Sequence, residues 1–283
     1  HITYEQFDIN VRRLASALIE TGIKKGDTVS VMAPNIPAFL EANFAVPMAG
    51  AVLNALNIRL DSRAIAFNLD HGECDLLLTD TGFSEVIQEA LQMSSRNPLV
   101  IDIQDSNIPE GERLGLDYSD FVSRGDPKFA WNPPEDEWDA LALNYTSGTT
   151  GKSKGVVLSN ANILTAASGA ISFDKLRPGM EIVSYLPMAW VGDFIFSTCM
   201  APLGRLCINC PESRDTLMTD LKEIGPDFFF GPPRIFEGLL TSIMIRIEDA
   251  STIKKRLFHY FMNLAKKVGG DVLEGKSVGL FNR

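Results

Sequence analysis

The chain has 283 residues, of which 45% are hydrophobic, so it can form either two α/β lobes or one large domain with an ordinary core. It carries 26 basic and 36 acidic residues, a formal net charge of −10. This acidic balance argues against non-specific binding of nucleic acid, and we expect no nucleic-acid partner. The longest charge-free apolar stretch, residues 42–58, contains Pro47 and Gly50, which favours helix, turn and strand over a membrane span.

Helices and strands are predicted to alternate over the first part of the chain. A helix begins after Thr3, which with Gln6 forms a capping-box pattern, and ends at Gly22. Further helices are expected at 38–48, 61–69 and 84–93, and strands at 28–33, 51–55, 75–78 and 99–103. Such alternation predicts a parallel sheet covered by helices on both faces.

Residues 123–138 interrupt this pattern with three prolines, a glycine and mixed charges, and are predicted to be a connection. The alternation then resumes. Strands are expected at 140–144, 155–158, 182–186, 205–209, 228–230 and 277–281, and helices at 160–169, 194–200, 215–224, 234–247 and 251–268. We therefore predict an α/β protein with two parallel-sheet βαβ lobes, at about 1–125 and 139–283, joined by the linker at about 123–138.

The most informative motif is the polar stretch at residues 145–155, which combines hydroxyl side chains, glycines and two lysines between two apolar runs. Glycines let the backbone approach a ligand closely, and exposed backbone N–H groups form a nest for anions. Hydroxyls can bind phosphate oxygens or Mg²⁺, and lysine adds a positive charge. These residues predict a polyphosphate site, with a mobile polar connection as the alternative.

A P-loop is the first candidate for this motif, because Gly151, Lys152 and Ser153 match its second half. However, its first glycine should stand at position 146, which is Thr146, and a helix should begin directly after the motif. Residues 155–158 are instead expected to form a strand. A P-loop NTPase is therefore the weaker interpretation.

Residues Tyr145 to Val156, YTSGTTGKSKGV, resemble the signature loop of the adenylate-forming enzymes, which include acyl-CoA synthetases. Ser153 stands where this family usually has proline, which costs some rigidity of the loop but no phosphate donor. The resemblance implies that Thr146 is a ligand of Mg²⁺. It also implies that the nucleotide phosphates are bound by Thr146, Ser147, Gly148, Thr149, Thr150, Gly151 and Lys154.

Two later segments resemble the family's acid pocket. In SYLPMAW, Trp190 takes the place of an aromatic or histidine residue that borders the carboxylic acid, although Trp190 could equally be a core residue. In GPPRIFE, Gly231 and Arg234 would border the acyl chain, or the segment could simply begin a helix. These segments are similar to those of bacterial long-chain synthetases, whereas residues 64–72 and 137–144 resemble short- and medium-chain enzymes.

The resemblance implies activation of a carboxylic acid, most simply a fatty acid, by ATP to an acyl-adenylate and then to acyl-CoA, with Mg²⁺ and CoA. The family's later glutamate, ribose-binding aspartate and catalytic lysine have no match in this sequence. We therefore expect an N-terminal fragment of such an enzyme that contains no catalytic residue, lacks the C-terminal domain and is inactive alone. The alternative is a non-catalytic nucleotide-binding or interaction fragment.

The expected location is cytoplasmic. The four cysteines are expected to be reduced core residues, although Cys207-x-x-Cys210 also permits a zinc or redox site. The helix predicted at 251–268 has an apolar stripe and several basic residues. It is expected to be an ordinary surface helix, with peripheral contact to an anionic membrane as the alternative.

Overall fold

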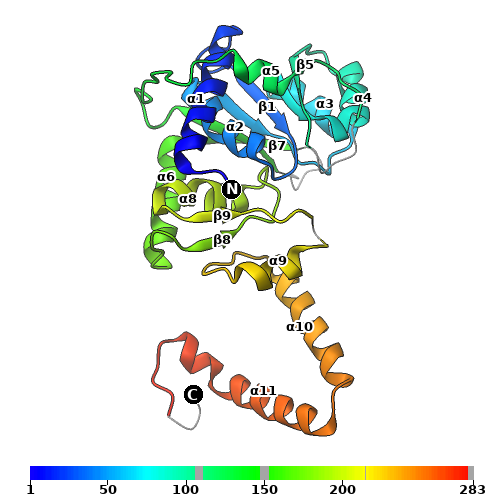
Figure 1. Ribbon diagram of the computed structural model, residues 1–283, viewed down its shortest axis with the longest axis vertical. Helices are drawn as coiled ribbons and strands as arrows, with labels where there is room; N and C mark the ends of the chain where they lie inside the picture. The colour runs from blue at the N-terminus through cyan, green and yellow to red at the C-terminus, as the bar shows by residue number, and fades with distance from the viewer. Residues whose placement is uncertain (106–110, 147–152, 214, 280–283) are drawn as a thin grey trace. The chain divides into compact units, whose positions relative to one another are not determined.

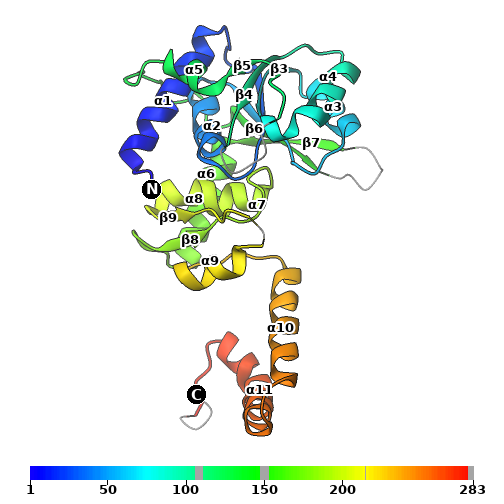
Figure 2. The ribbon, with the colours of Figure 1, turned by 45° about the vertical axis from the view of Figure 1, so that its right-hand side comes forward.

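The main structural element is a seven-stranded sheet with strand order β5-β4-β3-β1-β2-β6-β7 (Figures 1 and 2). The computed structural model describes residues 1–105, 111–146, 153–213 and 215–279. Its strands in this sheet are β1 (Thr28–Met32), β2 (Val52–Ala55), β3 (Cys74–Asp80), β4 (Leu99–Ile103), β5 (Leu116–Asp117), β6 (Ala140–Thr146) and β7 (Lys154–Ser159). Neighbouring strands run parallel except β6 and β7, which are antiparallel.

Helices cover both faces of this sheet, as predicted. One face is covered by α1 (Tyr4–Glu20), α2 (Pro37–Met48) and α5 (Tyr118–Ser123), and the other by α3 (Ser62–His71) and α4 (Ser84–Met93). Successive side chains of a strand point to opposite faces. In β3, Leu76 and Leu78 accordingly join the core under α1 and α2, whereas Leu77 joins the core under α3 and α4. This is why β3 is a nearly continuous apolar run.

Local sequence signals explain where the first helices begin. The Thr3 side chain accepts a hydrogen bond from the backbone N–H of Gln6 at 3.1 Å, and Asp61 accepts one from Ala64 at 2.8 Å. The Gln6 side chain donates to Asn10. Only the first of the two capping-box hydrogen bonds is therefore present at α1.

The structure differs from the expected lobe boundary at residue 139. Strands β6 and β7 belong to the first sheet, where Ala142 of β6 pairs with Leu53 of β2. Without β6, the parallel edge of β2 would leave its backbone N–H and C=O groups unpaired. The two-residue β5 and the short α5 were not predicted, because they are too short to show a period.

A second, two-stranded parallel sheet pairs β8 (Glu181–Val183) with β9 (Cys207–Asn209). Around it lie α6 (Asn160–Phe173), α7 (Val191–Asp193), a π-helical turn at Phe194–Cys199, α8 (Met200–Gly204) and α9 (Leu217–Ile224). Their shared core consists of Ala167, Ile182, Met200, Ala201 and Leu206. The strand predicted at 228–230 is reduced to one bridge between Ile182 and Phe228.

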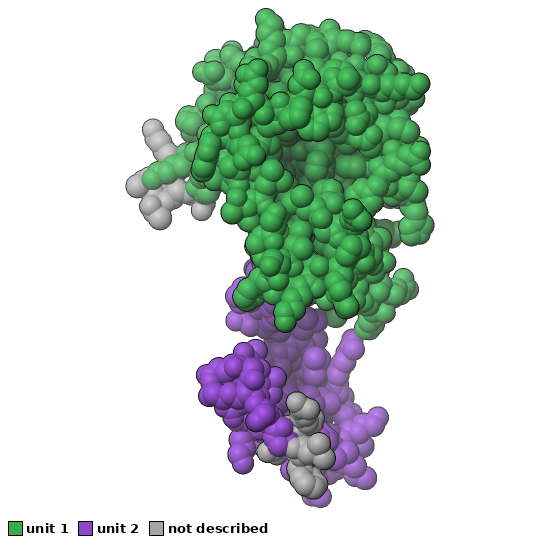
Figure 3. Space-filling view, turned by 90° about the vertical axis from the view of Figure 1, so that its left-hand side faces the viewer, with its two compact units in different colours: residues 1–229 green, residues 230–283 purple. Residues whose placement is uncertain are grey.

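The chain divides into two compact units, residues 1–229 and 230–283 (Figure 3). The second unit contains α10 (Pro233–Glu248) and α11 (Thr252–Leu273), and neither helix has a buried side chain. Residues 277–279 have no regular structure, and the rest of the strand predicted at 277–281 lies outside the described residues. Among the described helices, none combines the length and the apolar character needed to cross a bilayer.

Candidate functional site

The carboxyl ends of three neighbouring parallel strands define the candidate site. Asn35 follows β1, Arg59 follows β2, and Thr146 ends β6. Because β1, β2 and β6 are adjacent and parallel, these ends meet at one edge of the sheet. Open α/β sheets bind ligands at such an edge.

The β6–β7 hairpin carries the predicted phosphate loop. Thr146, the last residue of β6, pairs with Lys154, the first residue of β7, and both are exposed. Lys154 forms no ion pair with any carboxylate of the described residues. The structure therefore brings together these two predicted residues and leaves the lysine charge available. The other predicted phosphate ligands lie outside the described residues: Ser147, Gly148, Thr149, Thr150 and Gly151.

The start of the loop is anchored by an aromatic group that sequence reasoning missed. The Tyr145 hydroxyl is 2.8 Å from Nδ1 of His71, and Phe67 packs against both rings. Partial burial raises the pKa of Tyr145 to about 12, so its hydroxyl stays protonated at neutral pH. Gly155 faces Tyr145 across the strand pair, and a Cβ there would lie 2.9 Å from the Leu143 side chain. Tyr145 thus fixes β6 just before the loop.

The predicted acid segment, residues 184–190, follows β8 and is bound from the first sheet. Asn35 donates to the carbonyl oxygens of Ser184 at 3.1 Å and Leu186 at 2.7 Å, and accepts from the Met188 N–H at 3.0 Å. From β6, the buried Asn144 donates to the Ala189 carbonyl at 3.4 Å. The segment is therefore positioned at the same edge as Thr146, where β6 ends.

Trp190 is half-buried at the end of this segment, and its role at the acid stays a prediction. The guanidinium carbon of Arg59 lies 5.2 Å from the centre of the Trp190 ring, within cation–π distance. The backbone N–H of Arg59 donates to Asn57 Oδ1 at 3.1 Å, and this hydrogen bond holds the turn after β2. Arg59 was not predicted, because no motif marks a partner so far away in the sequence.

A buried carboxylate, that of Asp193, is hydrogen-bonded to the first residue of this segment. Asp193 is only 2% exposed, and it accepts hydrogen bonds from Ser184 at 2.7 Å and Ser197 at 3.0 Å. Burial raises the pKa of Asp193 to about 6, partly offset by the two serine hydroxyls. The hydrogen bonds of Asp193 could not be predicted from the sequence, because the contacts to Ser184 and Ser197 depend on the fold around a π-helical turn.

Gly231 and Arg234, the other predicted pocket residues, belong to the second unit. Gly231 stands two residues before α10, and Arg234 lies in its first turn with an exposed side chain. Their role at the acyl chain stays a prediction.

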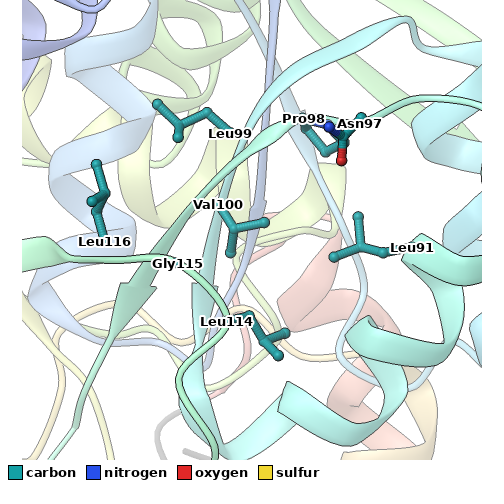
Figure 4. Close-up of a pocket in the computed structure, with 8 residues that line it drawn as sticks. All are labelled: Leu91, Asn97, Pro98, Leu99, Val100, Leu114, Gly115 and Leu116. Carbon is teal, nitrogen blue, oxygen red and sulfur yellow. The ribbon is translucent and has the colours of Figure 1, made fainter.

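The first unit also contains a pocket away from this edge and a groove that reaches the acid segment. A 490 Å³ pocket at the β4–β5 edge is lined mainly by apolar side chains, among them Leu91, Leu114 and Leu116 (Figure 4). A 690 Å³ groove between α1, α2 and β9 includes Asn35 and Met188 in its wall. Within the described part of the chain, no cluster of three His, Cys, Asp or Glu residues could hold a metal ion. This finding does not test the predicted Mg²⁺ ligand, because Thr146 is a hydroxyl residue.

Comparison with known proteins identifies the family. The model of the AMP-binding enzyme family matches residues 1–276. The chain belongs to this family. The family assignment predicted from YTSGTTGKSKGV is thereby confirmed.

Curated relatives of this AMP-binding chain include several CoA ligases. An acetate–CoA ligase of Humulus lupulus is 39% identical over 257 residues, which are 86% of this chain and 45% of that protein. A 2-methylpropanoate–CoA ligase of Humulus lupulus is 45% identical over 237 residues, 80% of this chain and 42% of that protein. A peroxisomal acetate/butyrate–CoA ligase of Arabidopsis thaliana is 38% identical over 219 residues, which are 73% of this chain and 38% of that protein. The chain spans less than half the length of these relatives.

Solved structures confirm the α/β fold. ATP-bound MatB from Rhodopseudomonas palustris superposes with a TM-score of 0.72 at 20% identity, over 84% of this chain and 46% of that chain. The inhibitor-bound N-terminal domain of FACL13 from Mycobacterium tuberculosis gives a TM-score of 0.72 at 22% identity, over 83% of this chain and 57% of that chain. Both show that the AMP-binding chain has the fold predicted for an N-terminal domain of adenylate-forming enzymes.

Proposed function

We propose that the protein containing this chain activates a carboxylic acid with ATP and transfers the acyl group to CoA. The observation that carries this proposal is the β6–β7 hairpin, which presents Thr146 opposite an exposed Lys154 at the ends of the signature loop. Family membership supports the same chemistry. ATP, Mg²⁺ and CoA are the small molecules that the reaction needs.

In the first step, an oxygen of the carboxylate attacks the α-phosphorus of ATP, and the bond to pyrophosphate breaks. In the second, the CoA thiol attacks the acyl carbon and AMP leaves. The chain's own contribution would be to position the phosphates and stabilise their charge, rather than to form a covalent bond. Thr146 would bind Mg²⁺ when present, and Lys154 and the loop residues 146–151 would bind the β- and γ-phosphates.

The substrate proposal is a short fatty acid. Trp190 would border the acid, with Gly231 and Arg234 near the acyl chain. The relatives that support this are named as ligases of acetate, butyrate and 2-methylpropanoate. A trans-cinnamate–CoA ligase of Petunia hybrida is 44% identical over 73% of this chain, so an aromatic acid is the competing class.

ATP–pyrophosphate exchange by the full-length protein tests this proposal, with saturated acids from acetate to stearate and with cinnamate. We expect exchange with acetate to butyrate to exceed exchange with stearate, and acyl-CoA to form once CoA is added. Exchange driven by stearate alone would keep the reaction but overturn the short-acid proposal. A protein that exchanges pyrophosphate with none of these acids would contradict the proposed function.

Ser153→Pro distinguishes this proposal from a P-loop NTPase. A P-loop would use Ser153 as its Mg²⁺ ligand at the start of a helix, whereas here strand β7 begins at Lys154. We expect MgATP binding to persist in Ser153→Pro, because proline restores the family's usual residue. Loss of binding with an unchanged circular dichroism spectrum would favour the P-loop.

A nucleotide-binding fragment without activity is the second candidate for residues 1–283 taken alone. The observation in its favour is that the chain spans less than half of its curated relatives. We expect the purified fragment to bind ATP and GTP with affinities within about tenfold, about 1.4 kcal/mol, because the predicted loop donors would bind the phosphates and not the base. Synthesis of acyl-CoA by this fragment would contradict that expectation.

Peripheral contact with an anionic membrane is a further proposal, for α11. Ile253, Leu257 and Phe261 of this helix are exposed, and Lys254 and Arg256 lie between them. Co-sedimentation with phosphatidylserine vesicles should exceed that with phosphatidylcholine and should fall with added salt. Equal sedimentation with both lipids would leave α11 as an ordinary surface helix. A cytoplasmic location stays a prediction, which fractionation of cells would test.

A further inference from the structure

The segment 184–190, which carries Trp190, has almost no regular structure of its own. Its backbone polar groups therefore need partners from elsewhere. Asn35 supplies three of them: it donates to the Ser184 and Leu186 carbonyls and accepts from the Met188 N–H. One side chain from the first sheet thus fixes three alternate residues of this segment.

The Asn35 contact continues into the buried interior of the second sheet. Asn35 Nδ2 lies 3.3 Å from the Ser184 hydroxyl oxygen, and that hydroxyl donates to Asp193 Oδ2 at 2.7 Å. Ser197 donates to the other oxygen of Asp193. Asn35 is therefore the outer end of a continuous hydrogen-bonded chain that enters the fold behind Trp190.

Asn35 also has a fixed position relative to β6, which ends at Thr146. It follows β1, which pairs with β2, and β2 pairs with β6, the strand that leads into the loop. Asn144 on β6 binds Ala189 at the opposite end of the same segment. The two asparagines connect the Trp190 segment to two strand ends of one rigid sheet.

We propose that Asn35 is a positioning residue, which sets the Trp190 segment at the distance from Thr146, at the end of β6, that the acid substrate requires. The proposal rests on the proposed function, because it assigns Asn35 to the acid side of the reaction. It does not make Asn35 a catalytic residue, since Asn35 acts through the backbone of residues 184–188.

Asn35→Asp is the sharpest test, because aspartate has the same shape and still accepts from Met188. It replaces the donor that faces two carbonyl oxygens by a carboxylate oxygen. Asn10→Asp is the matched control. Asn10 is also half-buried in the first unit and donates to a carboxylate, that of Glu41 at 2.7 Å, but it has no bond to the segment.

Two readouts separate positioning from general damage. The first is steady-state kinetics of the full-length protein with butyrate and MgATP. The second is the fluorescence of Trp190, measured without substrate after Trp131→Phe and Trp138→Phe remove the other two tryptophans, which are 40% and 70% exposed. The melting temperature of each variant is measured alongside.

We expect Asn35→Asp to lower kcat/KM for the acid about tenfold, as for the loss of one or two net hydrogen bonds, with KM for MgATP nearly unchanged. Trp190 emission should move to longer wavelength as the segment loosens. Asn10→Asp should lower the melting temperature and change neither property.

Three results would overturn the proposal. One is equal loss toward acid and MgATP in Asn35→Asp, another is the same kinetic change in Asn10→Asp, and the third is unchanged Trp190 emission in Asn35→Asp. If the protein activates no acid, the proposed function fails, and the emission of Trp190 alone decides whether Asn35 positions the segment.

Discussion

The end of the β6–β7 hairpin, at Thr146 and Lys154, and the Trp190 segment lie at the same edge of the first unit, but different interactions stabilise them. Thr146 and Lys154 are exposed at the ends of a two-stranded ladder and have no buried polar partner among the described residues. The Trp190 segment is bound by Asn35 and Asn144 and rests on the buried Asp193. The first arrangement keeps side chains free for a ligand, whereas the second uses side chains to fix a backbone.

This difference predicts different responses to substitution and pH. Replacing a residue of the loop should change ligand binding with little effect on stability. Replacing a residue of the buried network should change stability and its pH dependence.

The largest expected effect is on the pH dependence of unfolding through Asp193. Its pKa is about 6 in the folded protein and near 3.8 when unfolded, so the folded state binds more protons between these pH values. The contribution of Asp193 to stability is therefore highest below its unfolded pKa and is lost as pH rises through about 6. The loss is up to about 3 kcal/mol of unfolding free energy.

Asp193→Asn, which mimics the protonated acid, should be more stable than the wild type at pH 7 and equal to it near pH 4. Urea unfolding at several pH values measures this difference. Other carboxylates titrate in both proteins, so the difference between the two curves isolates Asp193. Parallel curves from pH 4 to pH 7 would show that Asp193 ionises as an ordinary surface aspartate does.

The next effect is on nucleotide use through Lys154. A charge-assisted hydrogen bond to phosphate contributes about 1.5–3 kcal/mol, so Lys154→Ala should lower kcat/KM for MgATP by about tenfold to a hundredfold. Lys152→Ala should do less, because Lys152 occupies the variable position of the family motif. Melting temperatures should stay close to that of the wild type.

Equal losses in Lys154→Ala and Lys152→Ala would mean that the register of the loop is wrong. A large fall in the melting temperature of Lys154→Ala would mean that Lys154 stabilises the fold, as the residues that bind the Trp190 segment do.

Much of the fold was predictable from the sequence. The period of apolar residues placed α4 and β4 at the residues where the structure has them, 84–93 and 99–103. The cap at Thr3 was visible because an N-cap and its partner lie within three residues. The sheet that β6 would join was not visible, since pairing with β2 is a contact between distant parts of the chain.

The candidate site divides in the same way. The contiguous motif predicts Thr146 and Lys154 as phosphate-site residues and resemblance predicts Trp190 at the acid, and these roles stay predictions. Asn35 and Arg59 were missed, because each acts on residues more than a hundred positions away. The partners of Asp193 could not be predicted, since its serine donors have no signature in the sequence.

A smaller effect is expected at Tyr145. This residue lies directly before the exposed Thr146, but its own side chain is fixed by His71 and Phe67. Tyr145→Phe removes the hydrogen bond to His71 and keeps the packing against Phe67. The unfolding free energy should fall by about 0.5–1.5 kcal/mol, the net contribution of one hydrogen bond. KM for MgATP should rise slightly, as β6 is less well fixed.

His71→Gln is a useful companion to Tyr145→Phe in urea unfolding. If the hydrogen bond is the cause, the double variant should lose less than the sum of the single losses. Strict additivity would mean that the two side chains do not interact in solution.

The smallest effect is expected at Arg59, which follows β2 and stacks on Trp190 at an exposed position. A cation–π contact of this kind contributes about 0.5–1 kcal/mol, so Arg59→Gln should change kcat/KM for the acid by no more than about fivefold. Arg59→Lys keeps the charge but not the planar stacking, so its kcat/KM for the acid should lie between those of the wild type and Arg59→Gln. In Trp190→Phe, which has a weaker ring quadrupole, Arg59→Gln should have almost no effect. If Arg59→Gln instead costs as much in Trp190→Phe as in the wild type, its side chain acts on the substrate directly and not through Trp190.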